Sequence, residues 1–445
     1  MDLQRNKVDA VNKTLLQVLD KAQGLMKLNH DDTKRNVKIL DALLIQMCDD
    51  LRAKDALFKK LYNRCVYSGS FYEDLRIKSP DEFDINIVFV LPKKGLQCEL
   101  QCLQRDRAFV GCCVDEEQFS NFTCVDASIA ALFSEFEGKY WLDMIKVRRW
   151  FQSLLARTND FGNIDGIVKV KYSESGPAKT LYILTANGRI DVDLVPVFEY
   201  ASEGWYSMLG TDSRVLDFME EKGVNIDNVT MCLVPKEHKP LNSPLYWRAH
   251  FPYIERQLMG SRNGCLKPTI RLLKLLRDNL QWSLISSYAL KTMVILHAME
   301  ESDYYWDKKR QGIVFYEVLQ RLRQALLGPG IPYIYCLKVD LLQGCKPVTR
   351  ENYACRLKGI LREIISQPLS LMKYFDKKSA MTSPVQNLRN FSLGGSCVTG
   401  PAQHIAHTSS LAAVDGLLSR EDTALLGVSS SEQHKENCCK SCIIM

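Results

Sequence analysis

The sequence predicts an α+β protein of two lobes, with a mixed core of helices and strands, a helical C-terminal lobe and a flexible tail. Residues 85–91 and 180–198 are rich in β-branched and aromatic residues, which is typical of buried strands. Residues 247–300 and 312–326 instead carry Leu, Ile and Met at helical spacing. Residues 376–437 contain a single aromatic residue, so this stretch lacks the apolar surface that would offset the entropy of ordering.

Length and composition limit the class of protein. The 445 residues allow two or three domains, and 46% hydrophobic with 25% charged residues supports a folded core. The net charge of +6 permits a polyanionic partner without requiring one. No apolar run approaches the roughly 18 residues of a membrane span, and residues 1–7 lack the apolar core of a secretion signal. We therefore expect a cytoplasmic protein whose 16 cysteines are mostly reduced thiols.

Four segments follow along the chain. We expect a helical extension at 1–30, a core lobe at 31–215, a helical lobe at 216–372 and a flexible tail at 373–445. A long amphipathic spine helix is predicted from Asp31, because apolar residues recur there at spacings of three and four, with capping side chains just before them. Those apolar residues are Val37, Leu40, Leu44, Met47 and Leu51, and the capping side chains are Asp31, Asp32 and Thr33. The opposite face of this helix is basic, which by itself indicates only a solvated surface.

The remaining elements of the core lobe follow the same logic. The first strand stops at Pro92, and the second strand stretch is interrupted by Asn187-Gly188, a dipeptide that favours a tight hairpin turn. Between the two strands, the sequence predicts a helix over residues 141–155. The first half of the chain therefore mixes helix with sheet.

A chemical motif precedes the first strand. Eleven residues separate Gly69-Ser70 from Glu82-Phe83-Asp84. Residues two apart in a strand share one face, so the two carboxylates project together and suit a pair of Mg²⁺ or Mn²⁺ ions.

A third carboxylate would come from the second strand. Asp193 is the first candidate and Asp191 the second, and this group is also suited to take a proton from an attacking ribose hydroxyl. Gly69 would let the backbone approach a triphosphate, whose oxygens the Ser70 hydroxyl can bond.

In this order the residues resemble nucleotidyltransferases of the polymerase-β-like superfamily. Residues 69–84 resemble more closely the activation loop and catalytic strand of cyclic GMP-AMP synthase (cGAS) and its animal relatives, the cGAS-like receptors. Further blocks match in the same order, over roughly residues 31–365. They are Leu233-Val234-Pro235-Lys236, Trp247-Arg248 leading to Ile254-Glu255, Arg271-Leu272-Leu273-Lys274, and residues 286–292.

The resemblance implies a bilobal nucleotidyltransferase core with a long spine helix, a helical C-terminal lobe and a disordered C-terminal tail. It also implies an enzyme whose substrates are ATP and GTP. Two divalent ions, Mg²⁺ or Mn²⁺, would be held by Glu82, Asp84 and Asp193. Carried onto matching positions, the nucleotide-binding residues would be Gly69, Ser70, Lys236, Arg248, Glu255, Lys274, Ser287, Tyr288 and Lys291. Lys274 would bind phosphate, Tyr288 would stack on a base, and Arg248 and Glu255 would lie in the base pocket.

The sequence departs from the vertebrate enzyme at several points. Only a short connector with Cys265 separates Met259 from Leu266, so the zinc-bearing DNA clamp is absent and no zinc is expected. His250 and Val195 stand where the vertebrate enzyme has small hydroxyl residues, which leaves the base preference open.

The expected activator is a nucleic acid. Residues 256–277 carry six basic residues and no acidic one. Together with the spine helix they would form a phosphate-tracking groove, with Lys34, Arg35, Lys38, Arg262 and Lys267 as the expected contacts. Loss of the zinc clamp resembles receptors that sense double-stranded RNA, so we favour double-stranded RNA over DNA, and leave a ligand-induced oligomer open.

The chain ends in Cys442-Ile443-Ile444-Met445, which fits a prenylation box whose final Met favours farnesyl. A single lipid anchors weakly, and Cys438 and Cys439 are candidate acylation sites for a second. The sequence therefore predicts peripheral association with a membrane surface through prenylated Cys442.

The leading interpretation is a nucleotidyltransferase that joins ATP and GTP into a cGAMP-like cyclic dinucleotide for innate immune signalling. The alternatives are a synthase of linear 2′–5′ oligoadenylates and a non-catalytic scaffold or binding relative of the same fold. The linkage, base order, activating ligand and oligomeric state stay open at this point.

Overall fold

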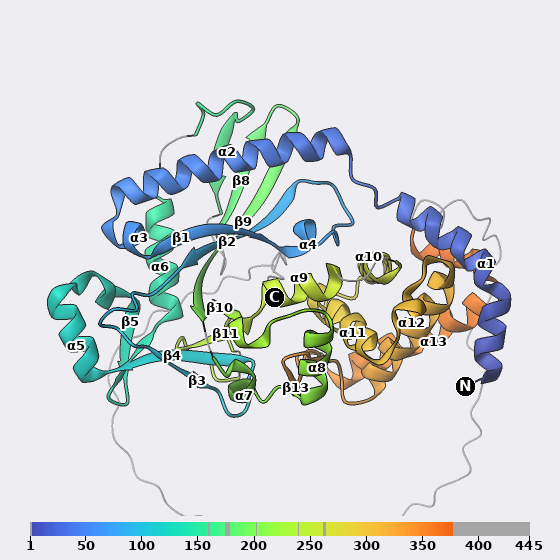
Figure 1. Cartoon of the computed structure of the whole chain (residues 1–445). Helices are drawn as coiled ribbons and strands as arrows, with labels where there is room; N and C mark the ends of the chain where they lie inside the picture. Colours follow the sequence, from blue (N-terminus) through green and yellow to red (C-terminus); the bar gives the residue numbers. More distant parts are fainter. Residues whose placement is uncertain are drawn as a thin grey trace, which may run out of the picture. The chain divides into compact units, whose positions relative to one another are not determined.

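A long helix, α2, crosses one face of a large mixed sheet in the computed structural model of the chain, and helices of a second lobe lie beyond it (Figure 1). The structure describes residues 2–158, 161–173, 179–201, 203–238, 240–260 and 264–376. The main helices of the first lobe are α2 (His30–Lys54), α3 (Ala56–Leu61), α4 (Gly69–Tyr72), α5 (Glu116–Val125), α6 (Met144–Leu155), α7 (Trp205–Leu209) and α8 (Ser213–Glu221). The others are α1 (Asp2–Gly24), α9 (Pro252–Gly260), α10 (Leu266–Asn279), α11 (Ser287–Glu300), α12 (Gln311–Leu327) and α13 (Pro347–Ser366), with 3-10 turns η1 (Ala127–Leu132), η2 (Ile226–Asn228), η3 (Asp303–Trp306), η4 (Lys308–Arg310) and η5 (Pro368–Tyr374).

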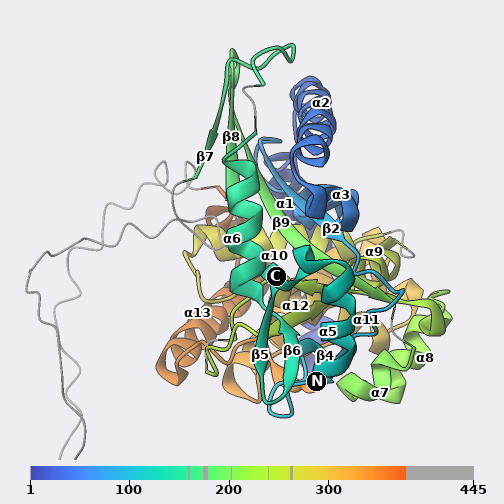
Figure 2. The ribbon, with the colours of Figure 1, turned by 90° about the vertical axis from the view of Figure 1, so that its left-hand side faces the viewer.

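The large sheet has 11 strands within the described residues, in the order β1-β2-β9-β10-β11-β4-β6-β5, with β3 paired to β4, β8 to β9 and β7 to β8. The strands are β1 (Tyr62–Ser68), β2 (Glu82–Phe89), β3 (Glu99–Cys102), β4 (Phe109–Asp115), β5 (Phe133–Phe136), β6 (Lys139–Leu142), β7 (Lys169–Tyr172), β8 (Lys179–Thr185), β9 (Gly188–Ala201), β10 (Thr230–Val234) and β11 (Tyr246–His250). The strands β12 (Pro332–Tyr333) and β13 (Cys336–Asp340) form a separate pair. β2 runs parallel to β9, and β7 and β8 project beside α2 in Figure 2.

The two faces of β2 have different environments. Phe83, Ile85, Ile87 and Phe89 alternate along it and are buried in the main core. Phe89 contacts aromatic rings from α3, α6 and β9, which packs the helices onto this face. The alternate residues, including Glu82 and Asp84, point to the opposite face.

The spine helix agrees closely with the prediction. Leu40, Leu44, Met47 and Leu51 are all buried, as the periodicity predicts. The helix is capped by Asn29 rather than by the residues we expected, because the Asn29 side chain accepts hydrogen bonds from the backbone N–H groups of the first turn. The hairpin turn predicted at Asn187-Gly188 joins β8 to β9.

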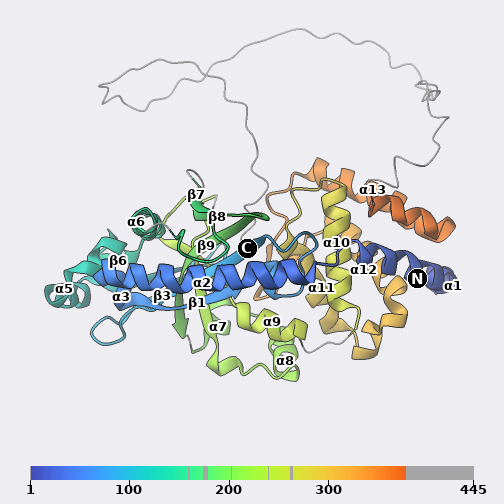
Figure 3. The same cartoon turned by 90° about the horizontal axis from the view of Figure 1, so that it is seen from above.

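The second lobe differs from the prediction at its beginning. Residues 247–250, which we expected to be helical, lie in β11, and the sheet extends beyond residue 215 through β10 and β11. The expected N-terminal helical extension contains α1, which packs against α12 and η5 of this lobe, as the view in Figure 3 shows. The expected α+β fold class is confirmed.

No helix of the described ranges has both the length and the hydropathy that a bilayer span requires. The folded part of the chain extends slightly past the predicted boundary at 373, because Tyr374 and Phe375 are buried. The rest of the expected flexible tail, with its lipidation cysteines Cys438, Cys439 and Cys442, lies outside the described residues.

Candidate active site

The parallel pairing of β2 with β9 brings the predicted acids into register. Asp84 lies opposite Asp193, and Glu82 lies opposite Asp191. All four side chains are at alternate positions, so they share the face of the sheet that points away from α2. Residues more than 100 positions apart in sequence therefore form one acidic cluster, here called the carboxylate cluster.

Asp193 is a better third acid than Asp191. Arg189 pairs with Asp191 through its Nε at 2.6 Å, so the charge of Asp191 is already neutralised. Asp193 is only 3% exposed and accepts a hydrogen bond of 2.5 Å from the Thr180 hydroxyl.

Burial and mutual repulsion shape the ionisation of the cluster. Burial, then the charges of Asp193 and Glu82, raise the pKa of Asp84 to about 7. The pKa of Asp193 is also raised, chiefly by burial and also by Glu82, although the bond from Thr180 opposes the shift. Two buried carboxylates that repel each other are stabilised by a bound cation, and oxygen ligands suit Mg²⁺ or Mn²⁺. The donor set therefore fits divalent ions.

Position 69 needs a glycine because the carboxylate of Asp84 lies against it. Its φ of +71° is in the left-handed region, and a Cβ built there would lie 1.8 Å from Asp84 Oδ2. The sequence predicts that this glycine lets the backbone approach a triphosphate. In this structure it leaves room for the carboxylate of Asp84.

The side chains of the carboxylate cluster are too far apart in this structure to coordinate one ion together. Among the described residues, no three His, Cys, Asp or Glu side chains are grouped closely enough to hold an ion. Glu82 instead pairs with Arg76, whose Nη1 lies 2.7 Å from Glu82 Oε2. This ion pair between Arg76 and Glu82 would have to break before Glu82 could coordinate a cation together with Asp84.

Three of the expected nucleotide-binding residues are bonded to one another. Tyr288 donates a hydrogen bond of 2.8 Å to Glu255, and Lys291 Nζ lies 2.7 Å from Glu255. Lys291 also bonds Glu73 at 2.9 Å, and the lysine is only 3% exposed. Burial alone would lower the pKa of Lys291, but the carboxylates of Glu255 and Glu73 outweigh burial and raise it.

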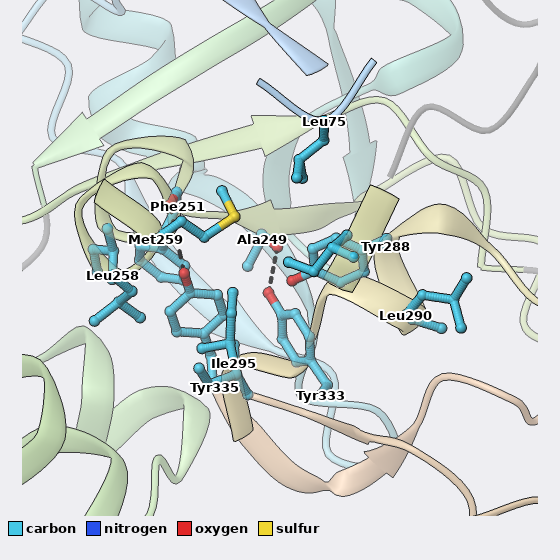
Figure 4. Packing of buried hydrophobic residues seen from close by; sticks show 14 of the residues in the cluster. Leu75, Ala249, Phe251, Leu258, Met259, Tyr288, Leu290, Ile295, Tyr333 and Tyr335 are labelled. Carbon is cyan, nitrogen blue, oxygen red and sulfur yellow. Dashed lines mark hydrogen bonds between the residues drawn. The ribbon is translucent and has the colours of Figure 1, made fainter. Parts of the chain in front are cut away.

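The segment between the two motifs, residues 70–80, is held on α10 and α11 by further contacts. Lys274 Nζ donates to the Leu75 carbonyl at 2.7 Å, and Lys267 pairs with Asp74 at 2.9 Å. Figure 4 shows Leu75 pointing toward the ring of Tyr288 and the tyrosines beneath it. Burial, with a contribution from nearby Arg277, lowers the pKa of Lys274 to about 7. Lys274 and Lys291, two side chains expected to meet a nucleotide, are thus bonded to this segment instead.

The other residues that we expect to bind the nucleotide lie in varied surroundings. The Arg248 guanidinium is 4.2 Å from the ring centre of Tyr333, a cation–π contact. Ser287 accepts a hydrogen bond of 3.0 Å from Arg277, Ser70 lies in α4, and Lys236 is exposed after β10. His250 is buried, its Nε2 has no partner among the described residues, and burial lowers its pKa to about 3.

The predicted nucleic-acid contacts are placed as follows. Lys34 and Lys38 are exposed on the first turns of α2, and Arg35 pairs with Asp32 at 2.8 Å. Arg271 of α10 donates to the Met26 carbonyl at 2.6 Å, so the basic helix α10 contacts the segment that joins α1 to α2. Arg262 lies outside the described residues.

Sequence reasoning assigned no role to Glu73, Arg76 or Thr180. Each contacts an expected site residue: Glu73 bonds Lys291, Arg76 bonds Glu82, and Thr180 bonds Asp193. Thr180 is the Cα partner of Asp193 across β8 and β9, so hairpin register counted from Asn187-Gly188 would have found it. Lys291, the partner of Glu73, lies 218 residues away, so no local signal in the sequence connects the two.

Comparison with known proteins identifies the class. Residues 71–261 match the family described as Mab-21 protein nucleotidyltransferase domain, and residues 265–359 match the Mab-21 protein HhH/H2TH-like domain. A cyclic GMP-AMP synthase-like receptor of Tribolium castaneum is 27% identical over 395 residues, covering 81% of this chain and 91% of the relative. A receptor of the same name from Aethina tumida is 29% identical over 369 residues, with 79% and 88% covered. Cyclic GMP-AMP synthase-like receptor 3 of Stylophora pistillata is 25% identical over 318 residues, with 66% and 80% covered.

The acidic cluster on paired strands and the two successive domain matches define a nucleotidyltransferase. Folds of this class generally use divalent metal ions. More particularly, the chain belongs to the Mab-21 nucleotidyltransferase family, and the expected resemblance to cGAS-like receptors is confirmed.

Proposed function

We propose that this chain is a metal-dependent cyclic dinucleotide synthase that is switched on by a nucleic acid and joins ATP with GTP. The register that pairs Asp84 with Asp193 is the observation that carries the proposal, because it supplies three carboxylates on one face. Relatives whose names include cyclic GMP-AMP synthase support this product class.

The roles of the chain's own residues follow from their positions. Bound divalent ions would stabilise the attacking and leaving oxygens of phosphoryl transfer. Glu82, Asp84 and Asp193 would hold those ions, and the raised pKa of Asp193 suits it to take the proton of a ribose hydroxyl. Lys274 binds phosphate, and Tyr288 offers its ring to a base.

Nucleotide binding requires rearrangement of the chain. Lys274 must leave the Leu75 carbonyl, and Tyr288 and Lys291 must leave Glu255 and Glu73. Residues 70–80 make several of these contacts, so their release from α10 and α11 accompanies activation.

The activator we propose is double-stranded RNA. Lys34 and Lys38 are exposed on α2, and α10 bonds the segment that leads into α2 through Arg271 and Met26; these basic groups support contacts to a phosphate backbone. Lys267 is part of this group and also holds Asp74 of residues 70–80. A polyanion that competes for Lys267 would weaken one of the contacts holding this segment.

The test is incubation of the purified full chain with four labelled NTPs, Mg²⁺ or Mn²⁺, and double-stranded RNA or DNA. The proposal expects a cyclic dinucleotide that requires the metal, ATP, GTP and RNA, and that Asp84→Asn abolishes. A linear 2′–5′ product would establish the oligoadenylate alternative. No product from folded protein with any nucleic acid would favour the non-catalytic scaffold.

We also propose peripheral membrane association in the cytoplasm through prenylated Cys442, supported by the terminal sequence alone. Cys438 and Cys439 would supply the second lipid that stable anchoring needs. Fractionation of the intact chain with and without a farnesyltransferase inhibitor tests this, and an unchanged distribution would contradict it.

A further inference from the structure

Two cysteines from different elements meet outside the carboxylate cluster. Cys48 of α2 and Cys65 of β1 have their sulfur atoms 3.5 Å apart and share a hydrogen bond. Cys48 is buried at 3% exposure, whereas Cys65 is partly exposed. The Tyr62 hydroxyl lies 3.4 Å from the Cys65 sulfur. Neither thiol has a part in the proposed transfer reaction.

The surroundings make the two thiols chemically unequal. The hydrogen bond from Cys48 lowers the pKa of Cys65 to about 7, with Tyr62 and the charge of Arg52 helping against burial. The Arg52 guanidinium stands 4.5 Å from the ring centre of Tyr62. The same hydrogen bond and burial raise the pKa of Cys48. Near neutral pH, Cys65 is therefore the reactive thiolate and Cys48 keeps its proton.

We propose that Cys48 and Cys65 form a reversible disulfide when the chain meets hydrogen peroxide. The Cys65 thiolate attacks one peroxide oxygen, the O–O bond breaks, and the products are a sulfenic acid on Cys65 and hydroxide, which takes a proton to become water. The Cys48 sulfur then attacks the Cys65 sulfur, the S–S bond forms as the S–O bond breaks, and the departing hydroxide leaves with the Cys48 proton as water. Two thiols lose two electrons in total, and one peroxide becomes two waters.

The geometry requires little movement. A disulfide has an S–S length of about 2.05 Å, so the sulfurs must approach by about 1.5 Å, which side-chain rotation can supply. The cross-link would fasten the spine helix to β1. Because β1 pairs with β2 and Ser68 lies opposite Asp84, this linkage reaches the strand that carries the carboxylate cluster.

The experiment uses the reduced full chain, titrated with hydrogen peroxide, alkylated and digested with trypsin without reductant. Mass spectrometry should find the peptides 39–52 and 65–76 joined, with the loss of two hydrogens, and dithiothreitol should separate them. Cys48→Ser should stop the reaction at a dimedone-reactive sulfenic acid on Cys65. Cys65→Ser should leave Cys48 reduced.

A second pair gives an internal comparison in the same digest. Cys98 and Cys112 also interact, but both are buried and their contact, with burial, raises the pKa of Cys112. We expect this pair to stay reduced at peroxide concentrations that link Cys48 to Cys65. The proposal is overturned if peroxide leaves both Cys48 and Cys65 open to alkylation, or if it links Cys98 to Cys112 first. Because the mapping uses the unmodified chain, a variant that fails to fold does not remove the test.

Discussion

Replacing Gly69 with alanine tests whether the carboxylate of Asp84 has to occupy its observed position. The new Cβ would lie 1.8 Å from Asp84 Oδ2, whereas real Cβ contacts are essentially never shorter than 3.0 Å, so the carboxylate must retreat by more than 1 Å. A shift of about 1 Å at a reacting centre costs roughly 100-fold in rate. The left-handed backbone adds about 1 kcal/mol of destabilisation, because φ is +71°.

Gly138→Ala is the matched control. Gly138 has the same φ of +71°, but nothing lies within 4 Å of its Cβ position, so it carries the backbone strain without the clash. Urea unfolding should show a similar loss of about 1 kcal/mol from backbone strain in both variants. Only Gly69→Ala should lose about 100-fold in nucleotidyl transfer and weaken Mn²⁺ binding measured by calorimetry. Equal activity and equal Mn²⁺ affinity in the two variants would refute this reasoning.

Five further predictions concern the site, its surroundings and the C-terminal sequence. The pKa of Asp84 near 7 predicts that Mn²⁺ affinity falls about tenfold per pH unit below pH 7, because the ion competes with a proton; a flat titration would contradict it. In the metal-free protein this raised pKa means that stability is lost as pH rises from about 4 to 7, so Asp84→Asn should raise the Tm at pH 8 and abolish transfer. Glu73→Gln weakens the contacts that hold residues 70–80 on α11. Amide hydrogen exchange of residues 70–80 should therefore become faster, and the rate of nucleotidyl transfer without RNA should rise; an unchanged exchange rate would argue against this. Substituting Lys34→Glu and Lys38→Glu together should weaken RNA binding. It should also make the plot of log affinity against log salt concentration shallower by about one phosphate contact per lysine, and an unchanged slope would show that α2 does not contact the RNA. Cys442→Ser should move the chain from membrane to soluble fractions, and unchanged fractionation would count against lipid anchoring.

The sequence could predict the carboxylate cluster because alternation within a strand is a local property. Glu82 and Asp84 had to share a face, and Asp193 had to share one with Asp191. Which two strands would pair, and in which register, is set by packing of the whole sheet. That pairing came from the resemblance and not from periodicity.

Other features left no comparable signal. Residues 247–250 form a short, fully buried strand, and such a stretch shows no alternation that separates it from a buried helix. The amphipathic pattern of α1 predicts a buried stripe but not the partner that covers it, which is α12. Glu73 and Arg76 lie in a loop, where no periodicity connects a charge to its distant partner.

The most direct measurement of the central claim is the position of Mn²⁺ by anomalous diffraction from crystals of the full chain grown with a non-hydrolysable ATP analogue. The account predicts anomalous peaks bounded by the carboxylate oxygens of Glu82, Asp84 and Asp193, with Arg76 displaced from Glu82. A bound nucleotide whose Mn²⁺ lies away from these three side chains, with Glu82 still paired to Arg76, would contradict it.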